Sequence, residues 1–358
     1  MQPSTGLTDQ PPESDDSSLP PQRIAVVVNG NARSVNEEVI STLDRILAGG
    51  DLFVSRRLSD AVDIASTIVS RGYGTVLTGG GDGTFTVVVT AVVREARRMG
   101  APLPRFGLLK LGTGNALAWV VGASGTGNRD LGTDVERLQA DAGSRPIRLV
   151  EVENQIAPFC GFGVDANLLA DYAKTGAMLA RTPLRPVAVG AVSYGLAAVT
   201  RTIPGSLLRP LPHVRVTNAG ADAYRLGTRG SRVGTTFGAG ETIYEGPARI
   251  AAISTIPYYG FGFRVFPYAN EREDRMHLRI STIGAKAFFR NFKSIWKGEF
   301  ESPEYLFDYL VQAIDIEADP PTAFQIGGDY VGERTRVRVA LTEETIRLVD
   351  FYAPPSAC

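Results

Sequence analysis

Glycines surround a single aspartate in the segment Thr78–Thr84, which reads Thr-Gly-Gly-Gly-Asp-Gly-Thr. We expect a buried strand before this segment and a helix after it, a position where ligands bind in open α/β sheets. Glycines let a backbone approach phosphate oxygens, and amides at the start of a helix favour an anion. Asp-Gly is also a common turn pair, although a plain turn does not call for three preceding glycines. We therefore predict that phosphates contact Gly79, Gly80, Gly81, Gly83 and Thr84, while Asp82 holds a bridging magnesium ion.

A second glycine turn occurs one strand later, in the sequence Lys-Leu-Gly-Thr-Gly-Asn that ends at Asn115. It could be a simple strand–helix connection in which Gly112 and Gly114 supply unusual dihedral angles. Two such turns on successive parallel strands, however, would face the same crevice. We therefore predict that Gly112, Thr113, Gly114 and Asn115 also contact the phosphates of a nucleotide.

The elements that position these turns follow a strand–helix rhythm. The apolar run Ile24–Val28 is typical of a strand buried on both faces of a parallel sheet, and it stops at the turn Asn29-Gly30-Asn31. Further strands are expected at 52–55, 75–78 and 106–109, and helices at about 35–47, 60–70, 85–98 and 116–121. This pattern predicts an open parallel α/β domain with right-handed crossovers.

Beyond about residue 146 the rhythm changes, because several expected strands follow one another without helices. These strands are expected at 147–152, 156–164, 211–217, 248–256, 261–266 and 275–282. Helical stretches are expected at about 166–206 and 284–298. The pattern predicts a second, mainly antiparallel β-sandwich domain. Two last strands, near 323–327 and 335–341, could pack on either domain.

Composition excludes several classes of protein. The 358 residues favour two domains, and a formal net charge of −1 argues against a globally basic nucleic-acid binder. Two cysteines and two histidines exclude a disulfide framework and an ordinary zinc site. Residues 1–22 contain five prolines, four acidic residues and no lysine or arginine, which predicts a disordered tail rather than a secretory signal. Because the weakly polar run 187–200 is too short to span a bilayer, we expect a cytoplasmic protein with peripheral membrane contact.

Both glycine turns together resemble the catalytic domain of the diacylglycerol kinase family, which includes bacterial lipid kinases, sphingosine kinases and ceramide kinases. Asn29–Ala32 resembles the family's first nucleotide loop, with Gly30 in place of a proline, and Gly161–Ala166 resembles a segment whose aspartate, here Asp165, is an active-site residue. The Gly-Asp-Gly-Thr element is shared with NAD kinases and phosphofructokinases, so it indicates only the superfamily. The Gly-Thr-Gly-Asn and Val-Asp-Ala elements are the ones that indicate the lipid branch.

The resemblance extends from about residue 24 to the C-terminus and implies a domain order. It implies an α/β ATP-binding domain over 23–145 after the tail, and a β-sandwich lipid-substrate domain over 146–334. The strands of 335–358 would return to the first domain. It also implies MgATP in the cleft between the domains, with Asn29 and Asn31 among the residues that contact the nucleotide.

For activity, the resemblance implies an ATP-dependent lipid kinase that transfers the γ-phosphoryl group to the hydroxyl of a diacylglycerol- or sphingoid-type lipid. The family's general base is a glutamate late in the chain, where this sequence has Asp329, with Glu333 as an alternative. Asp82 and Asp165 are the other expected acids. The chain departs from the family at Ala116 and Gly327, where aspartates are usual. Two other functions stay open, namely an NAD kinase-like enzyme and a nucleotide-binding regulatory protein that lacks catalysis.

Two segments predict contact with an anionic membrane. Residues 172–221 contain no acidic residue and six basic ones: Lys174, Arg181, Arg185, Arg201, Arg209 and Arg215. In 286–297, helical spacing places four basic residues on one stripe and three aromatic residues on the adjoining face, the pattern of a helix lying in a membrane interface. These residues are Lys286, Arg290, Lys293 and Lys297, with Phe289, Phe292 and Trp296. The alternative is that the aromatics pack on the sandwich. The sequence leaves a homodimer open and does not identify the lipid.

Overall fold

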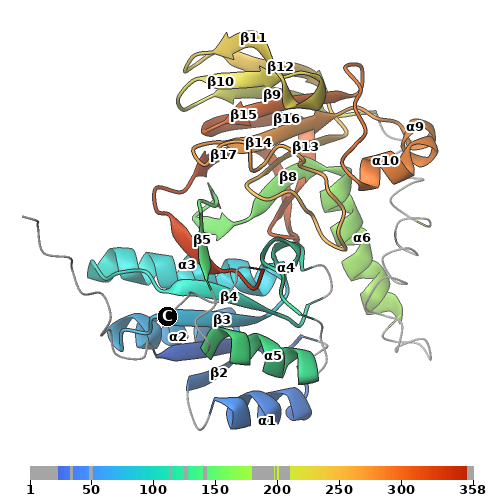
Figure 1. Ribbon diagram of the computed structural model, residues 1–358. Helices are drawn as coiled ribbons and strands as arrows, with labels where there is room; N and C mark the ends of the chain where they lie inside the picture. The colour runs from blue at the N-terminus through green and yellow to red at the C-terminus, as the bar shows by residue number, and fades with distance from the viewer. Residues whose placement is uncertain are drawn as a thin grey trace, which may run out of the picture.

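Two β-sheets organise the chain. The computed structural model describes residues 23–32, 35–47, 51–112, 115–124, 128–139, 143–179, 197, 200 and 210–352. Sheet A has six strands and sheet B has twelve. Figure 1 shows sheet A and its helices in the lower half of the molecule and sheet B in the upper half. The expected fold class, a mostly parallel α/β part followed by a large antiparallel part, is confirmed.

Sheet A has the strand order β2-β1-β3-β4-β18-β5. Its strands are β1 (Ile24–Asn29), β2 (Asp51–Ser55), β3 (Thr75–Gly80), β4 (Arg105–Lys110), β18 (Ile346–Val349) and β5 (Ser144–Ile147). All pair in parallel except β5, which runs antiparallel to β18. The helices of this part are α1 (Glu37–Ile46), α2 (Leu58–Ser70), α3 (Asp82–Met99), α4 (Ala116–Val121) and α5 (Asn128–Gln139). The apolar run of β1 is buried throughout Ala25–Val28, as a strand covered on both faces requires.

Helix α3 begins at Asp82, three residues earlier than the sequence predicts. Asp82, Gly83 and Thr84 therefore lie in its first turn, and Gly81 is the residue that precedes the helix. The helix buries an apolar face that includes Phe85 and is close enough to sheet B for the amide of Ile156, in β7, to donate to Thr90 Oγ1 at 2.8 Å. Because α3 contacts both sheets, it fixes the position of its first turn relative to each.

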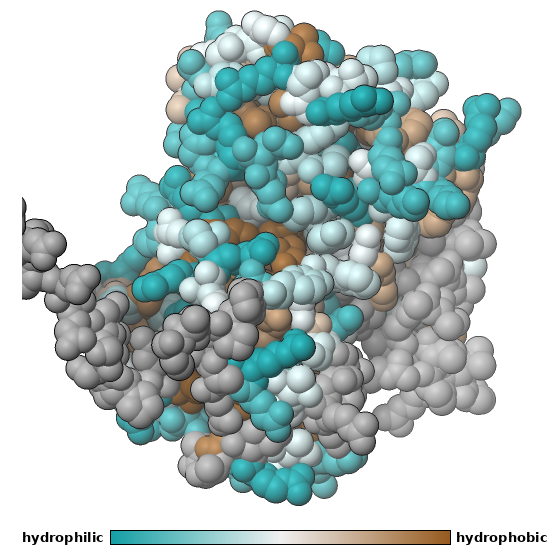
Figure 2. Space-filling view, in the orientation of Figure 1, coloured by the Kyte–Doolittle hydropathy of each residue, from teal (hydrophilic) through white to brown (hydrophobic). Residues whose placement is uncertain are grey.

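Sheet B is antiparallel at every strand pair, in the order β11-β10-β15-β14-β13-β8-β16-β17-β6-β7, with β9 and β12 attached through β16. Its strands are β6 (Val150–Val152), β7 (Gln155–Ala157), β8 (Phe159–Gly163), β9 (His213–Asn218), β10 (Ala223–Leu226), β11 (Arg232–Phe237), β12 (Thr242–Pro247), β13 (Ile250–Ser254), β14 (Met276–Ser281), β15 (Leu306–Val311), β16 (Ala313–Ile326) and β17 (Asp329–Leu341). The 3-10 turn η3 (Thr228–Gly230) lies between β10 and β11. Buried side chains from β9, β13, β14 and β16 form one core. Figure 2 shows hydrophobic surface at the level where the two halves meet.

The C-terminal strands divide between the sheets. Residues 335–341, expected to return to the first domain, instead belong to β17, where Val337 and Val339 pair with Ile316 and Ile314 of β16. Strand β18 does enter sheet A, between β4 and β5. The expectation was therefore wrong for 335–341, because the long β16–β17 ladder continues through them. The domain boundaries at 145 and 334 stay predictions.

Two further segments differ from expectation. Residues 261–266 form no strand, because Phe261 and Gly262 have φ angles of 52° and 76°, which turn the chain. Residues 284–298 form two short helices, α9 (Ala285–Arg290) and α10 (Phe292–Trp296), instead of one. Helix α6 (Val164–Leu179) covers the first part of the helical stretch expected over 166–206, and most of the remainder lies outside the described residues. Among the described helices, none is both long and apolar enough to cross a membrane.

Candidate functional site

The two glycine turns touch each other at the carboxyl edge of sheet A, where β3 and β4 end side by side. A Cβ placed on Gly112 would overlap the Cα of Gly81. The same addition on the other side of the contact is far less crowded, since a Cβ on Gly81 would lie 3.5 Å from the Cα of Gly112. The amide of Leu111 also donates to the carbonyl of Gly80, at 3.3 Å. The predicted convergence of these turns is therefore present as a direct backbone contact, and Gly112 is the residue that permits it.

Through its asparagines, the first loop is tied to the first turn of α3 and to the end of β2. Asn29 Nδ2 donates to Thr84 Oγ1 at 3.2 Å, and Asn29 Oδ1 accepts from the amide of Asn31 at 2.9 Å. Asn31 Nδ2 donates to the carbonyl of Arg56, at the end of β2, at 2.8 Å. The side chain of Thr84 in turn occupies the space where Gly80 lacks a Cβ. The structure thus brings Asn29, Asn31, Gly80 and Thr84 together, while their contact with a nucleotide stays a prediction.

Asn115 closes the second turn. Its backbone is left-handed (φ 49°, ψ 52°), which asparagine adopts more readily than most residues. Its side chain is buried, accepts from the amide of Gly112 at 3.1 Å and donates to the Gly112 carbonyl. Gly79 lies within β3, where the side chains of Val28 and Leu111 fill the space that a Cβ would need. Core packing therefore requires glycine at this position. Thr113 and Gly114 lie outside the described residues.

The carboxylate of Asp82 joins the two glycine turns. It is buried, and its Oδ2 and Oδ1 accept the first amides of α4, from Ala116 at 2.8 Å and Leu117 at 3.2 Å. Burial and, to a smaller extent, the nearby charge of Asp329 raise the pKa of Asp82 to about 6, although these amides oppose the shift. Asp82 therefore starts one helix and caps the next, and it lies within electrostatic reach of a second acid.

That second acid, Asp329, comes from sheet B. Its carboxylate lies against Gly83 so closely that a Cβ on Gly83 would overlap Oδ2. Asp329 keeps access to solvent, yet partial burial raises its pKa. Glu333, the alternative candidate, lies four residues further along β17, opposite Ala323 and exposed. The structure thus brings Asp329 against the first turn of α3.

A two-residue hairpin positions Asp329. Gly327 and Gly328 connect β16 to β17 with φ angles of 57° and 88°, which a tight turn of this kind requires. The amide of Gly327 donates to the carbonyl of Phe159 at 2.9 Å, and a Cβ on Gly327 would overlap Thr86 Oγ1. The family's usual aspartate at this position would therefore need a different local backbone. Glycine is what this hairpin requires.

Asp165 lies in a separate buried polar cluster at the start of α6. Its Oδ2 accepts from the hydroxyl of Tyr259 at 2.8 Å and from Gln325 Nε2 at 3.4 Å. Burial raises the pKa of Asp165 and raises that of Tyr259 well above its usual value, so the phenol stays a donor. Asp165 Oδ1 is buried and, among the residues that the structure describes, has no hydrogen-bond partner. A buried acid with an unsatisfied oxygen often marks a functional site.

Gln325 connects this cluster to the hairpin. While its Nε2 faces Asp165 and Tyr259, its Oε1 accepts from the amide of Gly328 at 3.0 Å. One side chain therefore links Asp165 to the turn that carries Asp329. The sequence analysis assigned no role to Gln325 or Tyr259. Their only signal was position, because Gln325 lies just before the Gly-Gly pair and Tyr259 lies in an aromatic-rich segment.

The predicted basic segment 172–221 is only partly within the described residues. Lys174 is exposed on α6, whereas Arg215 on β9 forms an ion pair with Glu245 at 2.7 Å. Arg181, Arg185, Arg201 and Arg209 lie outside the described residues. The described part of this segment therefore supplies two separate basic residues.

The backbone contact between the turns predicts an asymmetric effect of adding one methyl group. Gly112→Ala forces two backbone segments apart, so we expect the free energy of unfolding to fall by about 1–3 kcal/mol. Gly81→Ala adds the same methyl on the other side of the contact, at an ordinary van der Waals distance, and should change stability by less than about 1 kcal/mol. Urea unfolding of both variants measures the difference. Equal losses would contradict the contact.

Comparison with known proteins agrees with this geometry. The family model described as "Diacylglycerol kinase catalytic domain" matches residues 23–152. Two curated proteins, each named "Probable lipid kinase YegS-like", come from two strains of Xanthomonas oryzae pv. oryzae and are 28% identical over 162 residues. That alignment covers 43% of this chain and 50% of each relative, so the matched region spans about half the length of those relatives.

Solved structures share the fold over nearly the whole chain. A crystal structure of a diacylglycerol kinase from Bacillus anthracis str. Sterne aligns with a TM-score of 0.59 and 14% identity, covering 94% of this chain and 98% of that chain. A second structure from the same organism aligns with a TM-score of 0.60 and 14% identity, covering 94% and 99%. At this identity the likeness concerns the fold. The sequence similarity to the diacylglycerol kinase catalytic domain covers residues 23–152 of this chain.

Proposed function

We propose that this protein is an ATP-dependent lipid kinase. The observation that carries the proposal is the contact between Asp329 and Gly83. It sets a carboxylate of sheet B directly over the helix start at which the glycine turns of sheet A converge. Phosphoryl transfer needs amides that face the phosphates, neutralisation of their charge, and a base for the attacking hydroxyl. The groups on the two sides of this contact would supply them.

The nucleotide would bind along the carboxyl edge of sheet A. The first turn of α3 presents amides without intrahelical partners, which favour the negative charge of phosphates. A pocket of about 470 Å³ lies at the end of β2 and is lined by Ile40, Val54, Arg56, Arg57 and Asp60. Asn31 binds the carbonyl of Arg56 at its rim. We propose this pocket for the nucleoside, with apolar walls for the base and polar groups for the sugar.

The acidic residues fit a magnesium ion that arrives with the nucleotide. Among the described residues, no three His, Cys, Asp or Glu side chains form a metal site by themselves. Magnesium in kinases needs only one or two carboxylates, since phosphates and water supply the other ligands. Among the described residues neither Asp82 nor Asp329 has a cationic partner, and both have raised pKa values, so a nearby cation would stabilise their ionised forms. Asp82 would hold the ion, which when bound neutralises charge on the phosphates.

Asp329 would act as the general base. Its raised pKa brings it closer to neutral pH than an ordinary aspartate, which suits proton abstraction. Its carboxylate would take the proton of the acceptor hydroxyl as that oxygen bonds to the γ-phosphorus and ADP leaves. Asp165 is too deeply buried to act without rearrangement, so we assign it to orienting groups around the acceptor.

The acceptor class rests on the family. The curated relatives carry the name of a probable lipid kinase, and the acceptor we propose is the hydroxyl of a diacylglycerol- or sphingoid-type lipid. A nucleotide-binding protein without catalysis is the second candidate. The observation in its favour is Ala116. A buried methyl group stands here where the family usually has a carboxylate, and Ala116 contacts Asp82 through its backbone amide.

Removal of the proposed base tests both candidates. Asp329→Asn keeps the shape of the side chain but cannot accept the proton, so we expect kcat to fall by about 10²–10⁴-fold with ATP affinity retained. Transfer of label from ATP to extracted lipid measures turnover, and calorimetry measures affinity. Glu333→Gln is the matched control and should keep wild-type turnover. Loss of turnover in the control but not in Asp329→Asn would reassign the base, and no wild-type turnover on any lipid would favour the second candidate.

Nucleotide binding should depend on pH through the two acids. Asp82 must be ionised to hold magnesium, so MgATP affinity should fall as pH decreases through about 6. Asp329→Asn removes the charge that helps to raise the pKa of Asp82, and the midpoint should therefore move to lower pH. Titration of MgATP between pH 5 and 8 measures both curves, and the comparison cancels the ionisation of ATP itself. An unchanged midpoint would mean that the two carboxylates do not interact.

A further inference from the structure

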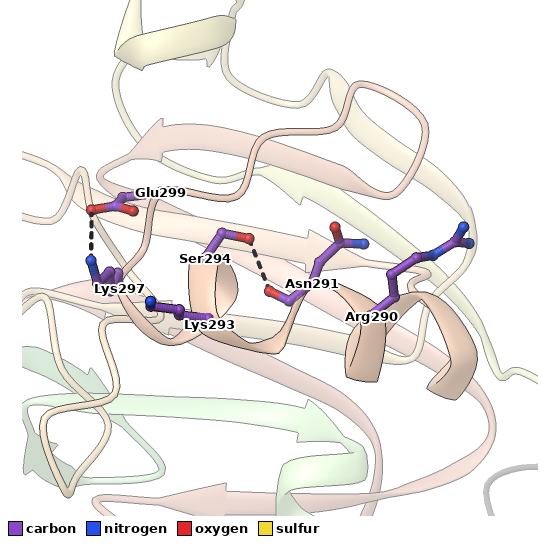
Figure 3. A pocket seen from close by; sticks show the side chains of 6 residues that line it. All are labelled: Arg290, Asn291, Lys293, Ser294, Lys297 and Glu299. Atoms are coloured by element: carbon purple, nitrogen blue, oxygen red, sulfur yellow. Dashed lines mark hydrogen bonds and ion pairs between the residues drawn. The ribbon is translucent and has the colours of Figure 1, made fainter.

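Helices α9 and α10 form a projection at the edge of sheet B (Figure 1). Asn291 separates them: its Nδ2 donates to the carbonyl of Ala287 at 2.9 Å, and its own carbonyl accepts from Ile295 and from Ser294 Oγ, each at 2.9 Å. Figure 3 shows the Ser294–Asn291 bond at this junction. The helix that the sequence predicts is therefore broken at Asn291, and these hydrogen bonds hold the two short helices together.

The aromatic residues of this projection divide between anchors and exposed groups. Trp296 stacks on Phe263 at 5.0 Å between ring centroids and 10° between planes, so it anchors α10 to the body of the protein. Phe289 and Phe292 are instead 57% and 43% exposed, and Phe288 lies in edge contact with both. The alternative of aromatics packed on the sandwich therefore holds for Trp296 and fails for Phe289 and Phe292.

Four basic residues surround these exposed rings. Lys286, Arg290, Lys293 and Lys297 are all exposed. Lys297 lies 3.9 Å from Glu299, whereas in the described part of the chain the other three form no ion pair. Three of the four line a shallow pocket of about 240 Å³, together with Asn291, Ser294 and Glu299 (Figure 3). Its cationic groups are donors suited to a phosphate.

We propose that α9 and α10 dock this protein on an anionic phospholipid bilayer. Phe289 and Phe292 would enter the boundary between head groups and acyl chains, while the basic residues contact lipid phosphates. A soluble acidic partner would explain the cations but not two adjacent exposed phenylalanines. The proposal rests on the proposed function in one respect, since a lipid acceptor is reached at a membrane.

The projection is also connected to the candidate site. The carbonyl of Trp296 accepts from the amide of Arg264 at 3.0 Å, and Phe263, which stacks on Trp296, donates its amide to Gly260 at 2.8 Å. Tyr259, the next residue back along this turn, holds Asp165. The turn formed by residues 259–264 therefore links the docking face to Asp165 of the site.

Sedimentation with vesicles tests the docking face without using kinase activity. The probes are phosphatidylcholine vesicles with and without phosphatidylglycerol, in the absence of ATP. One variant carries Lys286→Glu, Arg290→Glu and Lys293→Glu. Its matched control carries Arg45→Glu, Arg94→Glu and Arg137→Glu, which are exposed on helices of sheet A and give the same change in net charge. Circular dichroism checks the fold of each.

We expect the wild type and the control to bind anionic vesicles, and the first variant to bind at least about 100-fold more weakly. Phe289→Ala with Phe292→Ala should weaken binding about 10-fold. Equal binding by the first variant and the control would overturn the proposal, as would failure of the wild type to sediment. Binding of soluble inositol phosphates but not of vesicles would assign the face to a soluble anion and also overturn it.

Activity measurements separate this proposal from the proposed function. The charge-reversed variant should lose turnover on a vesicle-embedded diacylglycerol but keep it on a short-chain diacylglycerol dispersed in water. Vesicle binding without turnover on either substrate would contradict the kinase and leave the docking face intact. Turnover on both substrates by the charge-reversed variant would contradict the docking face alone.

Discussion

The buried carboxylate of Asp82 is the group on which the candidate site depends. It accepts the first two amides of α4 while belonging to the first turn of α3, so one side chain fixes two helix starts against each other. Because the carboxylate is buried, its charge is costly unless amides or a cation balance it. The amides supply part of this balance, and the approach of Asp329 works against it. The charges of Asp82 and Asp329 therefore repel each other in this site, and a bound cation would relieve that repulsion.

The sheet B side of the site is held by a different kind of contact. A polar chain runs from Asp165 through Gln325 to the amide of Gly328, and the hairpin then delivers Asp329 to Gly83. One glutamine therefore links Asp165 to the hairpin that positions Asp329. The departures from the family at Ala116 and Gly327 are each explained locally. Ala116 is fully buried, and Gly327 has no space for a side chain beside Thr86.

The convergence of the glycine turns could be predicted from the sequence, because parallel strands present their carboxyl ends at one edge of a sheet. The asparagines of the first loop were instead assigned through the resemblance to the diacylglycerol kinase family. Contacts made across the sheets could not be predicted in this way. No local pattern shows that Asp329 meets Gly83, or that Tyr259 reaches Asp165. The alternation of glycine and phenylalanine in 260–263 matched the period of a strand, yet the positive φ angles there produce a turn. Likewise, helical spacing alone did not reveal the break at Asn291.

Strand β18 makes the α/β half dependent on the last part of the chain. It lies between β4 and β5, with Ile346, Leu348 and Val349 buried, so sheet A has an internal gap until residues 346–349 are present. During synthesis, the first half of the protein would leave the ribosome well before its sheet could close. All strands of sheet B must also be synthesised before β18 can insert into sheet A. Completion of sheet A is thus coupled to synthesis of the other half of the chain.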